Sequence, residues 1–252
     1  MERWEFLKPD GLRFVWDDDL FPPGLDTFLI ASMPELKPNM RVCDLGSGTG
    51  LLSVILFQRQ PDIYITGIEI QPEAVKLANQ CAEENKLRNR FYTICADLRN
   101  LNLNNLNNIS PFDLVITNPP YYPAAGRASP ENIKKKIART EYGCNLLDLV
   151  KTAAKILRTG GKFCLVHKPE RLTDLLYYLR ENNLEPKRLR FVNQKPDAAP
   201  SLILLEARRG GKPGLSVEKP LILYHPDGSY TPELNQIYFR DEEIKYKNNI
   251  KI

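Results

Sequence analysis

A strand-like run leads directly into a glycine-rich turn and then into an apolar helix early in this chain, and this order constrains the fold most. Residues 40–45 are largely apolar, residues 46–50 are Gly-Ser-Gly-Thr-Gly, and residues 51–58 have apolar side chains at helical spacing. The first unit of a nucleotide-binding α/β sheet has this order, because glycines let a ligand approach the backbone closely. We therefore expect an α/β protein with a ligand at this turn.

The spacing of the turn indicates the kind of ligand. A dinucleotide-binding turn would have glycine at the position of Leu51, and Asp44 here stands two residues before the first glycine. A carboxylate at this place suits a cationic ligand better than a pyrophosphate. The pattern fits S-adenosylmethionine. The candidate cofactor contacts in this segment are Asp44, Gly46, Ser47, Gly48 and Gly50.

Two further strands are expected to end near carboxylates. Residues 63–68 should form a strand that ends at Glu69, followed by a helix over residues 72–84, and residues 91–95 should form a strand that leads to Asp97. Glu69 could accept both ribose hydroxyls, and Asp97 could meet the adenine amine. Each acid alone has an ordinary alternative as a surface or capping residue. Together with their neighbours Ile70 and Leu98, they complete the predicted cofactor site.

The fourth strand, expected over residues 112–117, runs into Asn118-Pro119-Pro120-Tyr121. Each proline fixes its own φ and keeps the residue before it extended, so this segment is stiff. Asn118 and Pro119 would offer two acceptors to an exocyclic amine, and Tyr121 a flat face for its ring. The alternative is a plain strand end with a packed tyrosine. We interpret the tetrapeptide as catalytic, with Asn118 also beside the cofactor.

The remaining pattern predicts a Rossmann-like, doubly wound seven-stranded sheet with an N-terminal β-hairpin. The hairpin strands are expected at 4–7 and 12–16, a helix at 25–33, helices at 145–157 (stopped by Gly160-Gly161) and 171–182, and strands at 162–167, 187–193 and 201–207. Residues 1–33 should pack on a catalytic domain over residues 34–239. The polar residues 240–252 are expected to be a disordered tail.

Composition limits the setting of the protein. The start of the chain lacks the features of a signal peptide, and no apolar run is long enough to span a membrane. The five cysteines are scattered, and His167 and His225 lie far apart, so we expect neither disulfides nor a metal site. These features favour a cytoplasmic protein. The oligomeric state stays open, with a monomer favoured.

Charge is distributed unevenly along the chain. Acidic residues outnumber basic ones before residue 127, and basic residues outnumber acidic ones two to one over residues 127–220. Such an excess is typical of a protein with a polyanionic partner, although a solvated surface is the alternative for each group alone. The candidate RNA-binding residues are Arg127, Lys134, Lys135, Lys136, Arg139, Arg208 and Arg209.

Together these motifs resemble those of class I, Rossmann-like S-adenosylmethionine-dependent methyltransferases that modify exocyclic or amide nitrogens. The stretch from Asp44 to Gly50, Glu69, Asp97 and the tetrapeptide at 118–121 resemble the first four motifs of that family. Enzymes with Asn-Pro-Pro-Tyr methylate N6 of adenine in DNA or RNA, N2 of guanine in ribosomal RNA, or N5 of glutamine in release factors. The resemblance implies S-adenosylmethionine as cofactor.

The rest of the chain resembles bacterial tRNA (adenine37-N6)-methyltransferases that act on valine tRNA. The similar segments are Arg13-Phe14 with Asp26, Ala138-Arg139-Thr140-Glu141, and residues 202–211, 220–224, 227–231 and 237–238; the loop at 123–130 fits less closely. The resemblance implies methyl transfer to N6 of an adenine in tRNA. The alternatives are an N2-guanine ribosomal RNA or protein glutamine N5-methyltransferase, and a non-catalytic RNA-binding protein on the same fold.

Overall fold

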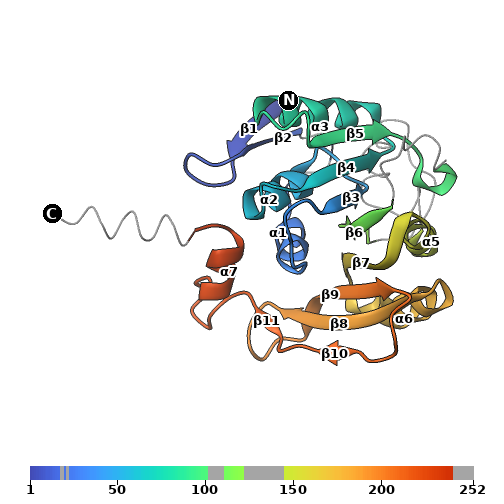
Figure 1. Cartoon of the computed structure of the whole chain (residues 1–252). Helices are drawn as coiled ribbons and strands as arrows, with labels where there is room; N and C mark the ends of the chain where they lie inside the picture. Colours follow the sequence, from blue (N-terminus) through green and yellow to red (C-terminus); the bar gives the residue numbers. More distant parts are fainter. Residues whose placement is uncertain (18–19, 21–22, 102–110, 122–144, 241–252) are drawn as a thin grey trace, which may run out of the picture.

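The computed structural model describes residues 1–17, 20, 23–101, 111–121 and 145–240. Within this part of the chain, nine strands form the main sheet, and the seven longest follow the order β8-β9-β7-β6-β3-β4-β5 (Figure 1). The strands are β3 (Arg41–Leu45), β4 (Tyr64–Glu69), β5 (Phe91–Cys95), β6 (Phe112–Thr117), β7 (Leu157–His167), β8 (Leu184–Asn193) and β9 (Pro200–Arg209). Neighbouring strands are parallel except for β9, which is antiparallel to both β7 and β8. The predicted doubly wound sheet is confirmed with all seven of its predicted strands, and two short further strands join it.

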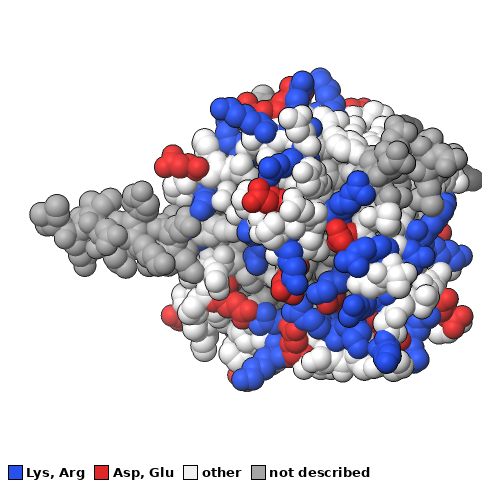
Figure 2. All heavy atoms as spheres, in the orientation of Figure 1, with Lys and Arg blue, Asp and Glu red and all other residues white. Residues whose placement is uncertain are grey.

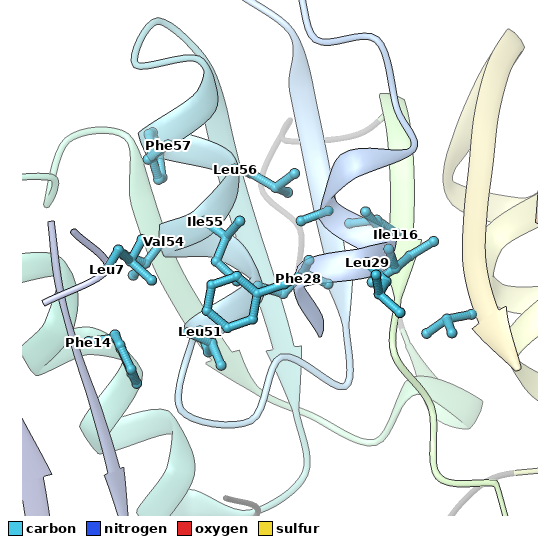
Figure 3. Close-up of a cluster of buried hydrophobic side chains, with 14 of the residues drawn as sticks. Leu7, Phe14, Phe28, Leu29, Leu51, Val54, Ile55, Leu56, Phe57 and Ile116 are labelled. Carbon is cyan, nitrogen blue, oxygen red and sulfur yellow. The ribbon is translucent and has the colours of Figure 1, made fainter. Parts of the chain in front are cut away.

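Helices cover both faces of the sheet. The central strands carry apolar side chains on both faces, and these side chains are buried under the helices. The helices are α1 (Leu25–Ser32), α2 (Leu51–Arg59), α3 (Pro72–Glu84), α5 (Leu146–Ile156), α6 (Leu172–Glu181) and α7 (Pro232–Ile237). Val42 and Leu114 face the core under α1, α2 and α3, while their neighbours Cys43 and Val115 face the core under α5 and α6. This alternation is the period of two that strands impose. Figure 3 shows part of the first core, where Phe28 lies beside Leu51 and Ile55.

The N-terminal hairpin is formed as predicted and packs on α2 and α3. Its strands, β1 (Glu2–Phe6) and β2 (Arg13–Asp17), are antiparallel. Phe14 and Val15 are buried in the first core. The amide of Arg13 donates to Asn85 Oδ1 at 2.8 Å, and the amide of Leu12 donates to Gln58 Oε1 at 3.0 Å. These bonds fix the hairpin against the ends of both helices.

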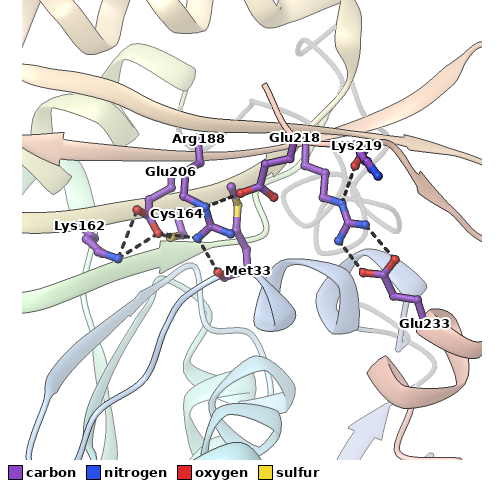
Figure 4. Close-up of polar contacts among 9 residues, drawn as sticks. Met33, Lys162, Cys164, Arg188, Glu206, Glu218, Lys219 and Glu233 are labelled. Carbon is purple, nitrogen blue, oxygen red and sulfur yellow. Dashed lines mark hydrogen bonds and ion pairs between the residues drawn. The ribbon is translucent and has the colours of Figure 1, made fainter. Parts of the chain in front are cut away.

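An ion network joins the sheet to the end of α1 (Figure 4). Glu206 on β9 is only 4% exposed, and its carboxylate lies 3.3 Å from Lys162 Nζ on β7 and 3.2 Å from Arg188 on β8. Arg188 also pairs with Glu218 at 2.6 Å and donates to the carbonyl of Met33 at 3.1 Å. A buried carboxylate needs such partners, so these strands and α1 are held in one arrangement.

Two features differ from or add to the sequence prediction. Gly160 and Gly161 do not stop a helix: α5 ends at Ile156, and β7 runs through both glycines. A side chain on Gly161 would lie 3.1 Å from the carbonyl oxygen of Phe112, so glycine permits close approach of β6 and β7 at a register shift. Two unpredicted two-residue strands, β10 (Ser216–Val217) and β11 (Leu221–Ile222), pair with β8. Beyond Arg240, the predicted tail lies outside the described residues.

Candidate active site

The carboxyl ends of β3 to β6 meet at one edge of the sheet, on both sides of the point where strand order reverses. Ligands in open α/β sheets bind at such a point. Thr117, the last residue of β6, is buried, and its Oγ1 donates to the carbonyl of Leu45 at the end of β3, at 2.7 Å. This bond aligns the two strand ends and brings Asn118 beside the glycine turn.

The turn after β3 has a backbone that glycine adopts readily. Gly46, Gly48 and Gly50 have φ values of +72°, +54° and +87°, in the left-handed region. A Cβ on Gly50 would lie 2.9 Å from Phe91 Cζ, whereas a Cβ on Gly46 or Gly48 would meet nothing within 4 Å. The outer side of the turn is therefore open to a ligand. On its inner side, the amide of Gly48 donates to Glu69 Oε2 at 3.0 Å.

Asp44 is a buried carboxylate with only one oxygen bonded in the described structure. It is 1% exposed, its Oδ2 accepts a hydrogen bond from Ser53 Oγ at 2.9 Å, and Oδ1 has no hydrogen-bond partner among the described residues. Burial raises the pKa of Asp44 to about 7; the bond from Ser53 opposes the shift, and the charge of Glu69 adds to it. An acid oxygen buried in this way suits a cationic donor.

Glu69 points from the end of β4 back to the turn. Its two oxygens accept backbone bonds from Gly48 and, at 2.9 Å, from Gln71, and each keeps a further lone pair. Burial raises the pKa of Glu69, and these bonds oppose the shift. Beside it, Ile70 leaves an apolar side chain 38% exposed, and buried Ser47 Oγ lacks a partner among the described residues. The acceptor oxygens of Glu69, the hydroxyl of Ser47 and the apolar side chain of Ile70 thus lie in one region.

Asp97 lies two residues beyond β5, at the same edge, but its carboxylate is already engaged. Arg99 donates to it through Nη2 at 2.6 Å and through its backbone amide at 2.9 Å. The side-chain hydrogen bond from Arg99 is the main reason that the pKa of Asp97 is lowered. Leu98 begins the short 3-10 helix η1 (Leu98–Asn100). The contact of Asp97 with an adenine amine stays a prediction. The amine would have to bind a carboxylate that Arg99 already occupies.

Helix α1 also holds the side chain of Asn118 in place. Its Nδ2 donates to Thr27 Oγ1 at 2.9 Å, and its Oδ1 lies 2.9 Å from the hydroxyl of Tyr121. The same hydroxyl donates to Asp26 Oδ2 at 2.6 Å. Pro119 between them is buried. The tetrapeptide is therefore fixed by side-chain contacts as well as by its prolines.

The ring of Tyr121 packs against the end of β7. The ring of His167 lies edge-on to it, with centroids 5.4 Å apart, and Lys168 Nζ is 5.4 Å from its centroid. His167 is 1% exposed, and burial lowers its pKa to about 4. Its Nδ1 accepts the backbone amide of Lys168 at 2.8 Å. His167 is therefore a neutral packing partner near neutral pH.

The predicted RNA-binding residues separate into two groups. Arg127, Lys134, Lys135, Lys136 and Arg139 lie outside the described residues. Arg208 and Arg209 end β9, which is antiparallel to β7, and Arg209 reaches Leu157 at the start of β7, so both arginines lie at the sheet edge opposite Asn118. Arg208 donates to the carbonyl of Gly160 at 3.2 Å, and Arg209 donates to that of Leu157. The structure does not bring these two arginines to the tetrapeptide.

The family described as methyltransferase small domain matches residues 25–177. The chain is also 31% identical over 214 residues to a tRNA1(Val) (adenine(37)-N6)-methyltransferase of Porphyromonas gingivalis, a match that covers 83% of this chain and 80% of the relative. The chain belongs to the methyltransferase small domain family. A second relative of this methyltransferase, from Tolumonas auensis and of the same description, is 30% identical over 211 residues, which cover 83% and 85% of the two chains.

Solved structures share the fold of this methyltransferase at lower identity. A predicted O-methyltransferase from Agrobacterium tumefaciens superposes with a TM-score of 0.68 at 21% identity, over 85% of this chain and 96% of that one. A putative class I S-adenosylmethionine-dependent methyltransferase from Listeria monocytogenes gives a TM-score of 0.59 at 18% identity, over 88% and 72%. The sheet described above is therefore a class I methyltransferase fold.

Sequence reasoning missed part of this methyltransferase site. Thr27, Ser53 and Lys168 had no assigned role, and Asp26 was noted only within a resemblance. No local pattern marks Thr27, since its partner Asn118 is distant in the chain and the two meet only in the folded protein. In the described part of the chain, no cluster of three or more His, Cys, Asp or Glu side chains could hold a metal, and no helix has the length and hydropathy to cross a membrane.

Proposed function

We propose that this methyltransferase transfers a methyl group from S-adenosylmethionine to the N6 amine of an adenine in tRNA, with adenine 37 of valine tRNA as the position. The observation that carries the proposal is the fixed carboxamide of Asn118 beside the glycine turn and the buried acid Asp44. The names of two relatives at 30% and 31% identity support the choice of substrate.

The cofactor site fits S-adenosylmethionine on the chemistry of its side chains. When bound, this cofactor supplies an electrophilic methyl group on a positively charged sulfur. Asp44 Oδ1, buried and without a partner among the described residues, would accept from the amino group. Glu69 would accept from the ribose hydroxyls through its remaining lone pairs, and Ile70 would pack on the adenine ring. Leu98 and Asp97 would border the same ring.

The tetrapeptide would bind the target amine. Asn118 Oδ1 and the carbonyl of Pro119 accept its two N–H donors and so turn its lone pair toward the methyl group. Tyr121 would stack on the adenine after the base has left its own stack. Proton removal before transfer is not required, because the amine becomes acidic only once methylated and would then lose its extra proton to water. The site does not need His167 as a general base. His167 is neutral, and its Nδ1 already accepts the backbone amide of Lys168.

Three alternatives remain to be tested: an N2-guanine ribosomal RNA enzyme, a protein glutamine N5-methyltransferase, and a non-catalytic RNA-binding protein. The experiment is incubation with radiolabelled S-adenosylmethionine and, separately, bulk tRNA, ribosomal RNA and protein, followed by mass analysis of the product. We expect N6-methyladenosine in valine tRNA. N2-methylguanosine or N5-methylglutamine would support one of the other enzymes. Cofactor binding without methyl transfer to any of the three would support the binding protein.

We also propose how the enzyme is organised, which residues contact tRNA and where it acts. We assign residues 1–33 to a hairpin and helix that accompany a methyltransferase domain over residues 34–239. The basic residues at 127–139 are assigned to tRNA phosphates, and Lys168, beside Tyr121, adds a positive charge at the site. A cytoplasmic location suits an enzyme that acts on tRNA. The oligomeric state is to be measured, with a monomer as the expectation.

A further inference from the structure

Helix α1 sends two consecutive side chains to the tetrapeptide. Thr27 Oγ1 accepts from Asn118 Nδ2 at 2.9 Å, and Asp26 Oδ2 accepts from the hydroxyl of Tyr121 at 2.6 Å. That hydroxyl is also 2.9 Å from Asn118 Oδ1. Four side chains thus lie in one polar cluster. The nitrogen of Asn118 is bonded to Thr27, and its oxygen shares the single proton of the Tyr121 hydroxyl with Asp26.

An asparagine carboxamide needs such bonds to present a fixed surface. Rotation about its last side-chain torsion is broad and has two nearly equivalent positions. Only the oxygen can accept a hydrogen bond, whereas the nitrogen presents donors that would oppose the donors of a target amine. Thr27 retains the nitrogen on the side of α1, and the hydroxyl of Tyr121 lies against the oxygen. One lone pair of Oδ1 then stays available.

Asp26 extends this arrangement to the aromatic ring. Its contact with the Tyr121 hydroxyl is the shortest of the three, as hydrogen bonds to carboxylates are. Asp26 also lies in the first turn of α1, where the helix dipole favours a negative charge. With His167 edge-on to the ring, the hydroxyl bond sets the direction in which the face of Tyr121 points.

We infer that Asp26, Thr27 and the hydroxyl of Tyr121 are positioning residues, which hold the carboxamide of Asn118 in the plane where Oδ1 accepts the target amine. This inference rests on the proposed function. It also assigns the hydroxyl of Tyr121 a role that stacking alone would not require.

The main test is Thr27→Val, which keeps the shape of the buried side chain and removes its hydroxyl. Single-turnover methyl transfer to valine tRNA should fall about tenfold, the loss that corresponds to one hydrogen bond. Binding of tRNA and of S-adenosylmethionine should not change. Thr27→Ser, which restores a hydroxyl, should recover most of the rate. Ser32→Ala, at the other end of α1, controls for general effects on the helix.

A double variant tests whether the two hydroxyls act on the same carboxamide. Tyr121→Phe should also slow transfer about tenfold. If both hydroxyls hold Asn118, loss of either one frees it, so the double variant should be little slower than each single variant. Multiplied losses would mean independent roles and would overturn the inference, as would wild-type rates in both single variants.

A spectroscopic measurement separates this inference from the proposed function. The side-chain amide signals of Asn118 can be identified by their loss in Asn118→Ala, and we expect them to shift in Thr27→Val and in Tyr121→Phe without any substrate. Unchanged signals in both variants would overturn the inference. If wild-type protein methylates no RNA but the signals shift, the proposed function fails and the positioning role stands.

Discussion

At the scale of single residues, Asp44 is a group whose place in the fold is unfavourable without a ligand. Its carboxylate is buried, one oxygen lacks a partner among the described residues, and burial raises its pKa to about 7. Buried charge is stabilised when an opposite charge pairs with it. The ammonium group of the cofactor is the expected partner, so Asp44 should link cofactor binding to pH.

We predict that affinity for S-adenosylmethionine falls as the pH is lowered from 7 to 5.5, by up to about tenfold per pH unit. Asp44 takes up a proton in this range in the free protein, since its pKa is about 7, and a neutral acid no longer attracts an ammonium. The amino group of the ligand stays charged throughout. Calorimetry at several pH values measures the slope. Asp44→Asn is the control and should bind weakly with no slope.

The same pKa shift predicts a change in stability with pH. The pKa of Asp44 rises from its ordinary 3.8 to about 7 on folding, so the folded protein holds more protons than the unfolded chain between these values. The stability contributed by this group therefore falls as the pH rises from about 4 to 7 and then stays low. The melting temperature of Asp44→Asn relative to wild type should increase between pH 5 and pH 8. A constant difference would contradict the raised pKa.

Asn118 is the residue on which the proposed chemistry depends. Asn118→Ala removes the side-chain acceptor but leaves the glycine turn and the prolines, so cofactor and tRNA binding should persist. Turnover should fall by about 10² to 10³, the usual loss for one preorganised contact at a reacting centre. Asn118→Asp keeps an acceptor, and Thr27 can turn its hydroxyl to donate to it, so it should retain more activity than Ala. Single-turnover methylation at the wild-type rate in Asn118→Ala would remove the tetrapeptide from the mechanism.

At the scale of helices and strands, the sequence was informative wherever one strong local pattern decided the structure. The predicted helix at 72–84 and the strands at 91–95 and 112–117 have the bounds found in the structure. The prediction that Gly160-Gly161 stops a helix was wrong. Glycine is common both at helix ends and where strands approach closely, and only the position of β6 distinguishes the two cases. The short α7 and the strands β10 and β11 lack a sequence pattern of sufficient length. Contacts between α1 and the tetrapeptide depend on tertiary structure alone.

The ion network around Glu206 gives a prediction for how the strands hold α1. Arg188→Ala should lower the free energy of unfolding by about 1–3 kcal/mol, because it leaves Lys162 as the one charged partner of the buried carboxylate in the described network and frees the carbonyl of Met33. Arg190→Ala on the same strand is the matched control. Its pair with Glu233 is at the surface and should contribute below about 1 kcal/mol. Urea unfolding measures both, and equal losses would mean that burial of Glu206 has no special effect.

At the scale of the whole molecule, the topology of the sheet decides which basic residues can lie near the site. Figure 2 shows Lys and Arg side chains mixed with acidic ones over this face, with many of them over the part that contains β8 and β10. From the sequence, the basic residues after position 127 form one candidate group for RNA binding. A sequence does not show at which edge of a sheet a given strand ends. The topology separates Arg208 and Arg209 from the tetrapeptide, since β9 runs antiparallel to β7.

This separation leads to a prediction about tRNA binding. Affinity for tRNA should fall steeply as salt increases, because phosphate contacts release counterions, whereas affinity for the cofactor should hardly change. Charge reversal of Lys134, Lys135 and Lys136, which follow the tetrapeptide in the chain, should flatten the salt dependence. Reversal of Arg208 and Arg209 should flatten it less, because both lie at the far edge and donate to carbonyls of β7. Filter binding between 50 and 200 mM salt, roughly the range over which such contacts are lost, compares the two variants with wild type. If reversal of the two arginines has the larger effect, tRNA crosses the opposite edge of the sheet, and if affinity does not depend on salt, the substrate is not a nucleic acid.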